Sequence, residues 1–359
     1  MKELTRRDFV QLAGMSVLGP LLHAGPLMRE KQTAPAASMA PEKGKQRLSI
    51  EQLAAWEKLA YGMFIHFGMS TFDDDEYSRG DKPATFYNPD KLDVNQWIGV
   101  ARDAGMKYAV LTAKHVAGHC LWPSKYTNYH VGNSGNKTDV VEAFVKACNQ
   151  KGLLPGLYYC SWDNHNLFGS GTPTNLTWAT AYTTSEYRDF QWKQLEELLT
   201  QYGPIAEVWI DIPHFLPRDY RQKLYNQISI WQPGAIILYN HGLTDGYELK
   251  VNTAWPTDVL TIERNVPNSK FPDLRWREIE KDKYYIPGEV VDTIGNEWFY
   301  KKADEPRTDA ELLGIYLLCR SRKTNLLLDV PPDKTGLISK KYIDALIRLN
   351  RNIEKNNKI

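Results

Sequence analysis

The sequence predicts an α/β fold, a (β/α)8 TIM-like barrel in which eight parallel strands alternate with helices. Two observations lead to this prediction. From residue 49 onward, eight short apolar segments follow one another, and most are separated by segments with helical periodicity. Such alternation brings parallel strands side by side with helices crossing between them, and eight units are the number that closes into a barrel. A doubly wound open sheet is the alternative.

The expected strands are short runs rich in apolar residues, and turn-forming or polar residues bound them. They cover residues 63–68, 108–114, 154–160, 207–211, 235–240, 259–263, 289–294 and 325–330. Each apolar run is too short for a helix of ordinary length, which favours strands.

The expected helices are longer amphipathic segments between these strands. They cover residues 49–59, 94–104, 139–151, 185–202, 217–232, 309–320 and 339–353. Ser49 and Asp93 precede the first two, and such side chains cap helix N-termini by accepting backbone N–H bonds. Helical segments are short or missing around strands five to seven, so we expect an irregular barrel there.

Composition and motifs exclude several classes of protein. The 44 basic and 43 acidic side chains give a net charge of +1, which argues against nucleic-acid binding because that needs a basic excess. The four cysteines form no CxxC pair, and no HExxH, GxGxxG or GxxxxGK[ST] motif is present. We therefore expect no metal and no nucleotide cofactor.

The first 44 residues predict an export signal followed by a flexible spacer. Arg6 and Arg7 precede a modest apolar stretch from Val10 to Leu27, which is typical of twin-arginine signals. Gly and Pro interrupt that stretch, so it is too short and too broken for a stable membrane span. We expect a periplasmic or cell-surface protein without a membrane span in its mature form, and one barrel domain over residues 45–359.

Polar side chains at the carboxyl ends of the strands are candidates for a site, because barrel proteins bind ligands there. In chain order they are His66; Lys114 and His115; Trp162 and Asp163; Trp209 and Asp211; Asn240 and His241; Glu263 and Arg264; Glu289 and Asp292. Imidazoles and carboxylates hydrogen-bond hydroxyls, and indoles stack on sugar rings. This set therefore suits a carbohydrate ligand.

Two carboxyl groups on either side of one glycosidic bond make a glycosidase: one protonates the leaving oxygen, and the other attacks the sugar or activates water. Asp211 is the candidate nucleophile because it ends a buried strand abruptly. Glu263 or Glu289 is the candidate acid/base. The plainer interpretation of Asp211 is a cap for the turn that follows.

Several motifs together resemble the α-L-fucosidases of glycoside hydrolase family 29. They are YGMFIHFG at 61–68, LTAKH at 111–115, CLWPSKYT at 120–127, EVWID at 207–211 and NLLLDVPPD at 325–333, followed by GLI at 336–338. The resemblance covers about residues 49–353. It implies the barrel fold and an exo-acting, retaining hydrolase that releases terminal L-fucose from a fucosylated oligosaccharide or glycoconjugate.

The resemblance also implies roles for individual residues. Asp211 would be the nucleophile, and Trp209 would line the sugar pocket beside it. The sequence TIE at 261–263 is similar to a Thr-x-Glu of some members, which favours Glu263 as acid/base and leaves Glu289 in reserve. The substrate-binding set would be His66, Glu76, Tyr77, His115, Trp162, Trp209, His241 and Trp298.

A further segment bears on the linkage. The sequence WFY at 298–300 is similar to the branch of the family associated with α-1,3/1,4-linked fucose. The chain ends near the expected last helix of the barrel, so we expect no C-terminal β-sandwich of the kind seen in many relatives.

Two departures from the family pattern keep alternatives open. Val116 stands where the family has a second sugar-facing histidine, and Ile212 follows the nucleophile where the family usually has glycine. A glycan-binding relative that has lost turnover is one alternative, since a fold does not guarantee chemistry. A glycosidase for a related sugar, such as α-L-galactose, is another.

Overall fold

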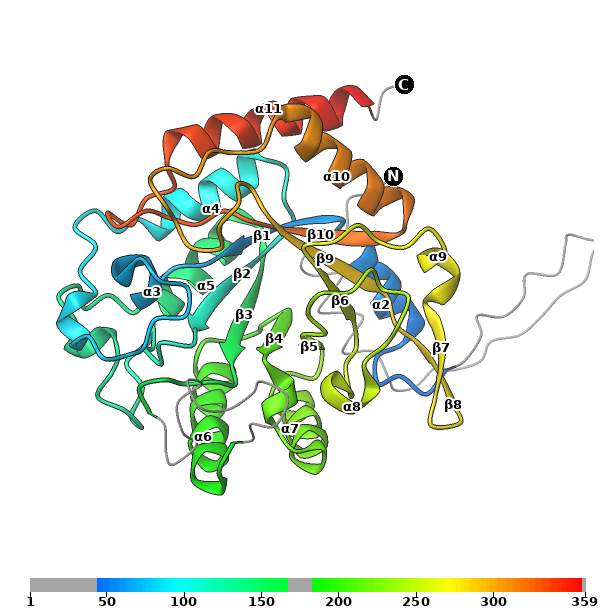
Figure 1. Ribbon diagram of the computed structural model, residues 1–359, viewed down its shortest axis with the longest axis horizontal. Coiled ribbons are helices and arrows are strands. Elements are labelled where there is room, and N and C mark those ends of the chain that lie inside the picture. Colours follow the sequence, from blue (N-terminus) through cyan, green and yellow to red (C-terminus); the bar gives the residue numbers. More distant parts are fainter. Residues whose placement is uncertain (1–43, 167–182, 357–359) are drawn as a thin grey trace, which may run out of the picture.

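The computed structural model describes residues 44–166 and 183–356, and these residues form an eight-stranded, all-parallel sheet that curves into a nearly closed barrel (Figure 1). The strands are β1 (Tyr61–Ile65), β2 (Tyr108–Lys114), β3 (Leu154–Cys160), β4 (Glu207–Asp211), β5 (Ile236–Tyr239), β6 (Leu260–Glu263), β9 (Gly288–Thr293) and β10 (Thr324–Asp329). Their order in the sheet is β5-β4-β3-β2-β1-β10-β9-β6. The predicted barrel is confirmed, and the doubly wound alternative is wrong because no strand order reverses within the sheet.

The two edge strands, β5 and β6, close the barrel through the residues just before β6. Asp258 donates its backbone N–H to the carbonyl of Ile237 at 2.8 Å, and its carboxylate accepts the N–H of Ile237 at 2.8 Å. The hydroxyl of Thr257 accepts the N–H of Tyr239 at 3.1 Å. Side chains thus replace the missing ladder bonds at this seam.

Within the described residues, seven long helices pack around the sheet, as the sequence predicted. They are α2 (Ile50–Glu57), α4 (Val94–Asp103), α5 (Val140–Lys151), α6 (Ser185–Gln201), α7 (Arg218–Trp231), α10 (Asp309–Ser321) and α11 (Lys340–Asn356). Ser49 caps α2 in a capping box and Asp93 caps α4, each accepting a backbone N–H bond. Both predicted caps are confirmed.

The barrel is irregular where the sequence lacks long helical segments. Only the short helix α8 (Val251–Ala254) lies between β5 and β6. The short helix α9 (Phe271–Leu274) and an antiparallel hairpin of β7 (Trp276–Ile279) and β8 (Asp282–Tyr285) replace a helix between β6 and β9. The sequence predicted the irregularity but not the hairpin, nor the short helix α3 (Met69–Asp73) after β1.

Aromatic and aliphatic side chains fill the interior of the barrel. Phe64, Tyr158, Trp209 and Leu327 belong to one buried cluster, which Trp56 of α2 also joins. Because successive side chains of a strand face opposite sides, Glu207, Trp209 and Asp211 of β4 lie on one face of their strand. Asp211 thus projects at the open carboxyl end, above an aromatic layer.

The predicted export signal and most of its spacer lie in residues 1–43, outside the described residues. Among the residues that the structure describes, no helix is both long and apolar enough to cross a membrane.

Candidate active site

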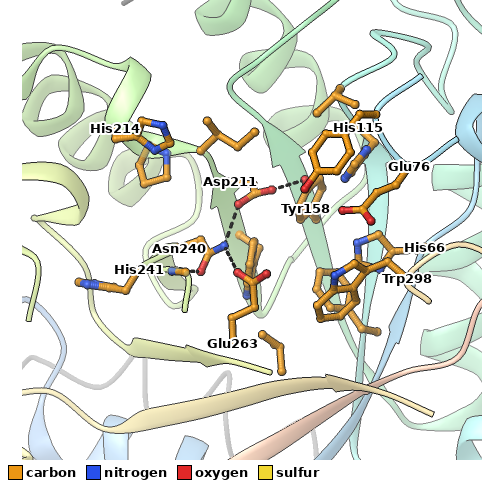
Figure 2. Close-up of a pocket in the computed structure, with 18 of the residues that line it drawn as sticks. His66, Glu76, His115, Tyr158, Asp211, His214, Asn240, His241, Glu263 and Trp298 are labelled. Carbon is orange, nitrogen blue, oxygen red and sulfur yellow. Dashed lines mark hydrogen bonds between the residues drawn. The ribbon is translucent and has the colours of Figure 1, made fainter. Parts of the chain in front are cut away.

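A cavity of about 390 Å³ opens at the carboxyl ends of the strands, where the barrel fold predicts a site. It is lined by nine of the eleven predicted site residues: Asp211, Glu263, His66, Glu76, Tyr77, His115, Trp209, His241 and Trp298. Figure 2 shows that Asp211, Asn240 and Glu263 lie across its middle. His66, Glu76, His115 and Trp298 lie on one side of them, and His214 and His241 on the other.

Two neutral donors hold the carboxylate of Asp211 at the end of β4. The hydroxyl of Tyr158 donates to Oδ2 at 2.6 Å, and Nδ2 of Asn240 donates to Oδ1 at 2.9 Å. The short 3₁₀ helix that follows, Pro213–Phe215, has no side-chain cap. The plainer interpretation of Asp211 as a cap is therefore wrong, and its carboxylate faces the cavity.

Glu263 lies across the cavity at the end of β6. Burial, together with the charge of Asp211, raises the pKa of Glu263 to about 7, although the hydrogen bond from Asn240 opposes this rise. A large fraction of Glu263 is therefore protonated at neutral pH. Glu263 can therefore donate a proton near neutral pH, which the role of a general acid requires.

The distance between the two carboxyl groups is limited by one amide. Nδ2 of Asn240 lies 2.9 Å from Oδ1 of Asp211 and 3.0 Å from Oε2 of Glu263. Those two oxygens are therefore at most 5.9 Å apart, the sum of the two distances. Retaining glycosidases place their carboxyl groups roughly 5–5.5 Å apart, and inverting enzymes roughly 6.5–9.5 Å apart.

Two neutral imidazoles line the side of the cavity opposite His214. Burial lowers the pKa of His66 to about 4 and that of His115 to about 3. Oδ1 of Asp329 accepts the backbone N–H of His66 and lies 2.8 Å from Nδ1 of its ring. Nδ1 of His66 therefore carries the ring proton, and Nε2 remains an acceptor for a ligand hydroxyl.

Aromatic rings form the floor of the same half of the cavity. Tyr158 stacks on Trp209 with ring centroids 5.3 Å apart, and Phe64 packs against Trp209 at 5.4 Å. Trp298 packs against His66 at 5.1 Å, and the guanidinium of Arg264 lies over Trp298 at 5.6 Å. Faces of this kind suit the C–H groups of a pyranose ring.

Glu76 and Tyr77 reach the cavity from the loop after α3. Burial raises the pKa of Glu76, and the nearby His66 opposes that rise. Ser70, inside α3, donates its hydroxyl to the carbonyl of Glu76 at 3.1 Å, which ties the loop to the helix. A carboxyl group next to neutral imidazoles supplies both donors and acceptors for sugar hydroxyls.

A buried arginine positions the loop after Asp211. The guanidinium of Arg221, in α7, donates to the carbonyls of Leu216 and Asn252 at 2.6 Å and to that of Trp255 at 3.1 Å. These carbonyls belong to the loop after β4, to α8 and to the residue after α8. One side chain thus ties together two segments that border the cavity beside His214.

Glu289 is not in the cavity, which corrects its prediction as reserve acid/base. It is the second residue of β9 and fully buried near the amino end of the barrel, where the hydroxyl of Tyr108 donates to it at 2.6 Å. Burial raises the pKa of Glu289 to about 7, and Glu207 lies beside it. The prediction erred because Glu289 begins a strand, whereas functional groups of a barrel gather where strands end.

Trp162 also lies outside the cavity, although it follows a strand. Its Nε1 donates to Asn164 at 2.7 Å, and its ring packs against Phe215 at 4.4 Å. It packs against the loop after β4 through Phe215 and does not line the cavity. Lys114 and Asp163, two other residues at strand ends, form a fully buried ion pair at 2.7 Å.

Sequence reasoning missed two residues that contact Asp211. Tyr158 lies inside β3, two residues before its end, so a search of strand ends does not select it. Tyr158 and Cys160 lie on the same face of the strand because side chains alternate between its two faces. This alternation was the sequence signal that could have placed Tyr158 below the strand end. Asn240 was placed at a strand end, but no role was assigned to it.

Within residues 44–166 and 183–356, no group of three or more His, Cys, Asp or Glu side chains is arranged to hold a metal ion.

Comparison with known proteins identifies the relatives of the chain. A model of the family described as α-L-fucosidase matches residues 72–358. α-L-Fucosidase 1 of Arabidopsis thaliana is 33% identical over 321 residues, which cover 83% of this chain and 59% of that protein. A putative α-L-fucosidase 1 of Oryza sativa is 30% identical over 352 residues, covering 93% of this chain and 63% of that protein. The chain thus spans about six-tenths of the length of these relatives.

Solved structures described as α-L-fucosidases also match the chain. A putative α-L-fucosidase from Bacteroides thetaiotaomicron superposes with a TM-score of 0.70 at 30% identity, covering 85% of this chain and 68% of that one. α-L-Fucosidase isoenzyme 1 from Paenibacillus thiaminolyticus superposes with a TM-score of 0.70 at 25% identity, covering 86% of this chain and 76% of that one.

Proposed function

Because the chain belongs to the α-L-fucosidase family, we propose that it is an exo-acting, retaining α-L-fucosidase that releases terminal L-fucose from fucosylated glycans. The observation that carries the proposal is the pair of carboxyl groups, Asp211 and Glu263, that share the amide of Asn240. The separation of at most 5.9 Å between Oδ1 of Asp211 and Oε2 of Glu263, the sum of the two bonds, supports retention, because inverting enzymes place their carboxyl groups roughly 6.5–9.5 Å apart.

In the first step, the carboxylate of Asp211 attacks the anomeric carbon of fucose while the glycosidic bond breaks. Glu263, protonated because of its raised pKa, gives its proton to the leaving oxygen. A fucosyl ester forms on Asp211, and the aglycone leaves as an alcohol.

In the second step, Glu263 is now ionised and accepts a proton from water. That water attacks the anomeric carbon, the ester bond breaks, and Asp211 recovers its charge. The charge of Asp211 raises the pKa of Glu263 before the first step, and this effect disappears while the ester persists. One residue thus serves as acid and then as base.

The two sides of the cavity suit different parts of the substrate. His66, His115, Glu76 and Trp298 offer neutral imidazoles, a carboxyl group and an aromatic face, which suit the fucose ring. The opposite side, beside His214, would receive the rest of the glycan. We propose α-1,3/1,4 linkages, on the basis of the segment at 298–300 and the position of Trp298 in the cavity.

Hydrolysis of 4-nitrophenyl α-L-fucoside tests the proposal, with the β-anomer and the α-L-galactoside as controls. We expect turnover of the α-L-fucoside and its loss, by about a thousandfold or more, in Asp211→Asn, which keeps the size of the side chain but removes the nucleophile. Asp292→Asn is a matched control, because Asp292 pairs with Arg307 and does not line the cavity. Full activity of Asp211→Asn would overturn the assignment of Asp211.

The same measurement separates the alternatives. Binding of L-fucose without hydrolysis of any fucoside would favour the glycan-binding alternative, and faster turnover of the α-L-galactoside would favour the related sugar. The pairing of a carboxyl group of raised pKa with Asp211 favours turnover, since sugar binding alone needs no protonated carboxyl group.

We also propose that the protein is exported to the periplasm or cell surface, on the basis of Arg6 and Arg7. Cell fractionation tests this, with an Arg6→Lys, Arg7→Lys double variant expected to stay in the cytoplasm. Equal export of the double variant would contradict it.

A further inference from the structure

The side-chain amide of Asn240 contacts both Asp211 and Glu263. We propose that Asn240 is a positioning residue that fixes the separation of the two carboxyl groups and determines which oxygen of Glu263 carries the transferable proton, namely Oε1. This inference rests on the proposed hydrolase function. It assigns a role to a residue that has none in the two-carboxylate mechanism.

The orientation of the Asn240 amide follows from its partners. A backbone N–H can only donate, and that of Gly242 lies 2.8 Å from Oδ1 of Asn240, so this atom is the carbonyl oxygen. Nδ2 therefore faces the carboxyl groups, and each of its two protons has one acceptor: Asp211 at 2.9 Å and Glu263 at 3.0 Å. A flipped amide would set its oxygen against two carboxyl oxygens and its N–H groups against a donor.

The bond to Glu263 determines where the acid holds its proton. Oε2 accepts an N–H from Asn240, and the carbonyl oxygen of a carboxylic acid accepts hydrogen bonds better than its hydroxyl oxygen. The proton of neutral Glu263 therefore lies on Oε1. Oε2 is held toward β5, so Oε1 remains the oxygen that can deliver a proton to the leaving group in the cavity.

Thr261 holds the amide in place from the next strand. Its hydroxyl donates to Oδ1 of Asn240 at 2.9 Å and accepts the backbone N–H of His241 at 2.8 Å. Thr261 is fully buried and lies two residues before Glu263 on the same strand. β6 thus supplies both the acid and the hydroxyl that fixes its partner, and every polar atom of the Asn240 side chain has a partner.

Other charged or titratable groups also affect the pKa of Glu263, and their effects must be distinguished from that of Asn240. Asp211 faces it from β4, Glu76 and Tyr77 from the loop after α3, and Arg264 from the residue after β6. The hydrogen bond from Asn240 lowers the pKa of Glu263, against the rise caused by burial and by Asp211. Loss of the Asn240 side chain should therefore raise the pKa of Glu263.

The experiment compares two substrates that differ in their need for an acid. 2,4-Dinitrophenyl α-L-fucoside has a leaving group that departs without protonation, whereas methyl α-L-fucoside requires the proton. General acid catalysis contributes roughly 10²–10⁴-fold. For Asn240→Ala we expect kcat/KM to fall by roughly 100-fold with the methyl fucoside and by less than about tenfold with the dinitrophenyl fucoside. We also expect the alkaline limb of kcat/KM to move to higher pH.

A second pair of variants tests the same arrangement without touching Asn240. Thr261→Val removes the hydroxyl at nearly constant shape, and Thr261→Ser keeps it. We expect Thr261→Val to lower kcat/KM more with the methyl fucoside than with the dinitrophenyl fucoside, as Asn240→Ala does, but to a smaller extent. Thr261→Ser should retain most of the wild-type kcat/KM with the methyl fucoside. Asn164→Ala is the matched control, because that amide bonds Trp162 and the carbonyl of Ser78 but neither carboxyl group.

Equal losses on both substrates with an unmoved alkaline limb, in both Asn240→Ala and Thr261→Val, would overturn the inference. If Asn240→Ala does not fold, as judged by thermal unfolding, the Thr261 pair decides alone. A wild-type protein that hydrolyses neither fucoside would instead overturn the proposed function, so the two failures are distinguishable.

Discussion

Asp211 and Glu263 have nearly the same side-chain chemistry but different surroundings. Asp211 accepts hydrogen bonds from Tyr158 and Asn240, and both bonds stabilise its charge. Glu263 receives one such bond, and its burial beside Asp211 raises its pKa to about 7. In the proposed mechanism, the number of donors and the depth of burial assign attack to Asp211 and proton donation to Glu263.

The raised pKa of Glu263 predicts the alkaline limb of activity. The acid must be protonated, so kcat/KM for an alkyl fucoside is fully present well below pH 7 and falls as pH rises through about 7. Glu263→Gln cannot donate a proton, and we expect it to lose roughly 10²–10⁴-fold of this activity together with the limb. A pH profile of kcat/KM from pH 4 to 9 checks this, and an unchanged limb in Glu263→Gln would contradict it.

At the scale of elements, short segments rather than long helices directly follow three of the strands that border the cavity. After β4, β5 and β6 the chain forms a 3₁₀ turn, the short α8 and the short α9. Arg221, which is fully buried, bonds carbonyls of the first two of these segments. A single guanidinium thus ties these two short segments to the long helix α7.

Arg221→Lys tests this support. A lysine has three donors on one nitrogen and cannot reach carbonyls in three directions, so some buried acceptors lose their partner. We expect unfolding free energy to fall by roughly 3 kcal/mol, and kcat to fall because the loop after Asp211 is released. Urea unfolding measures the first effect. Arg218→Lys, at a half-exposed position of the same helix, is the control, and equal stability of the two variants would contradict the prediction.

The sequence predicted elements better than it predicted contacts. All eight barrel strands and seven long helices follow from periodicity and caps, because Ser49 and Asp93 act through their immediate neighbours. Glu289 was misplaced because it was grouped with the strand ends, although the expected strand at 289–294 begins with it. Tyr158 was missed because its bond to Asp211 joins two strands 53 residues apart in sequence, and no local pattern encodes that.

At the scale of the whole molecule, the two ends of the barrel differ in their exposure to solvent. The carboxyl ends of the strands surround the cavity, whereas the amino ends enclose Glu207 and Glu289 without solvent contact. Burial raises the pKa of both groups; Glu289 raises the pKa of Glu207 further, whereas hydrogen bonds from Tyr108 and Glu207 oppose the rise at Glu289. This buried pair makes the stability of the fold depend on pH independently of the active site.

Glu289→Gln tests that dependence. The folded pKa of Glu289 is about 7 against an ordinary value of 4.5, so the folded state holds a proton that the unfolded state releases. The contribution of protonated Glu289 to the free energy of unfolding is thus fully present below pH 4.5 and is lost as pH rises through about 7. We expect Glu289→Gln to gain roughly 2–3 kcal/mol relative to wild type at pH 8 but little at pH 4.5, measured by urea unfolding.

The same variant checks the correction of Glu289. Because Glu289 lies outside the cavity, we expect its kcat/KM on an aryl fucoside to stay within a few-fold of wild type. A loss of a hundredfold or more in a folded Glu289→Gln protein would return Glu289 to the catalytic set.

Covalent trapping tests the central claim most directly. A fluorine at C2 of a fucosyl fluoride slows both steps, but fluoride leaves readily, so a retaining enzyme accumulates the fucosyl ester. After incubation with 2-deoxy-2-fluoro-α-L-fucosyl fluoride, digestion and mass spectrometry should find one added fluorofucosyl group on the peptide that contains Asp211, and none in Asp211→Asn. A label on another residue, or turnover of natural substrate with no label at all, would contradict the account.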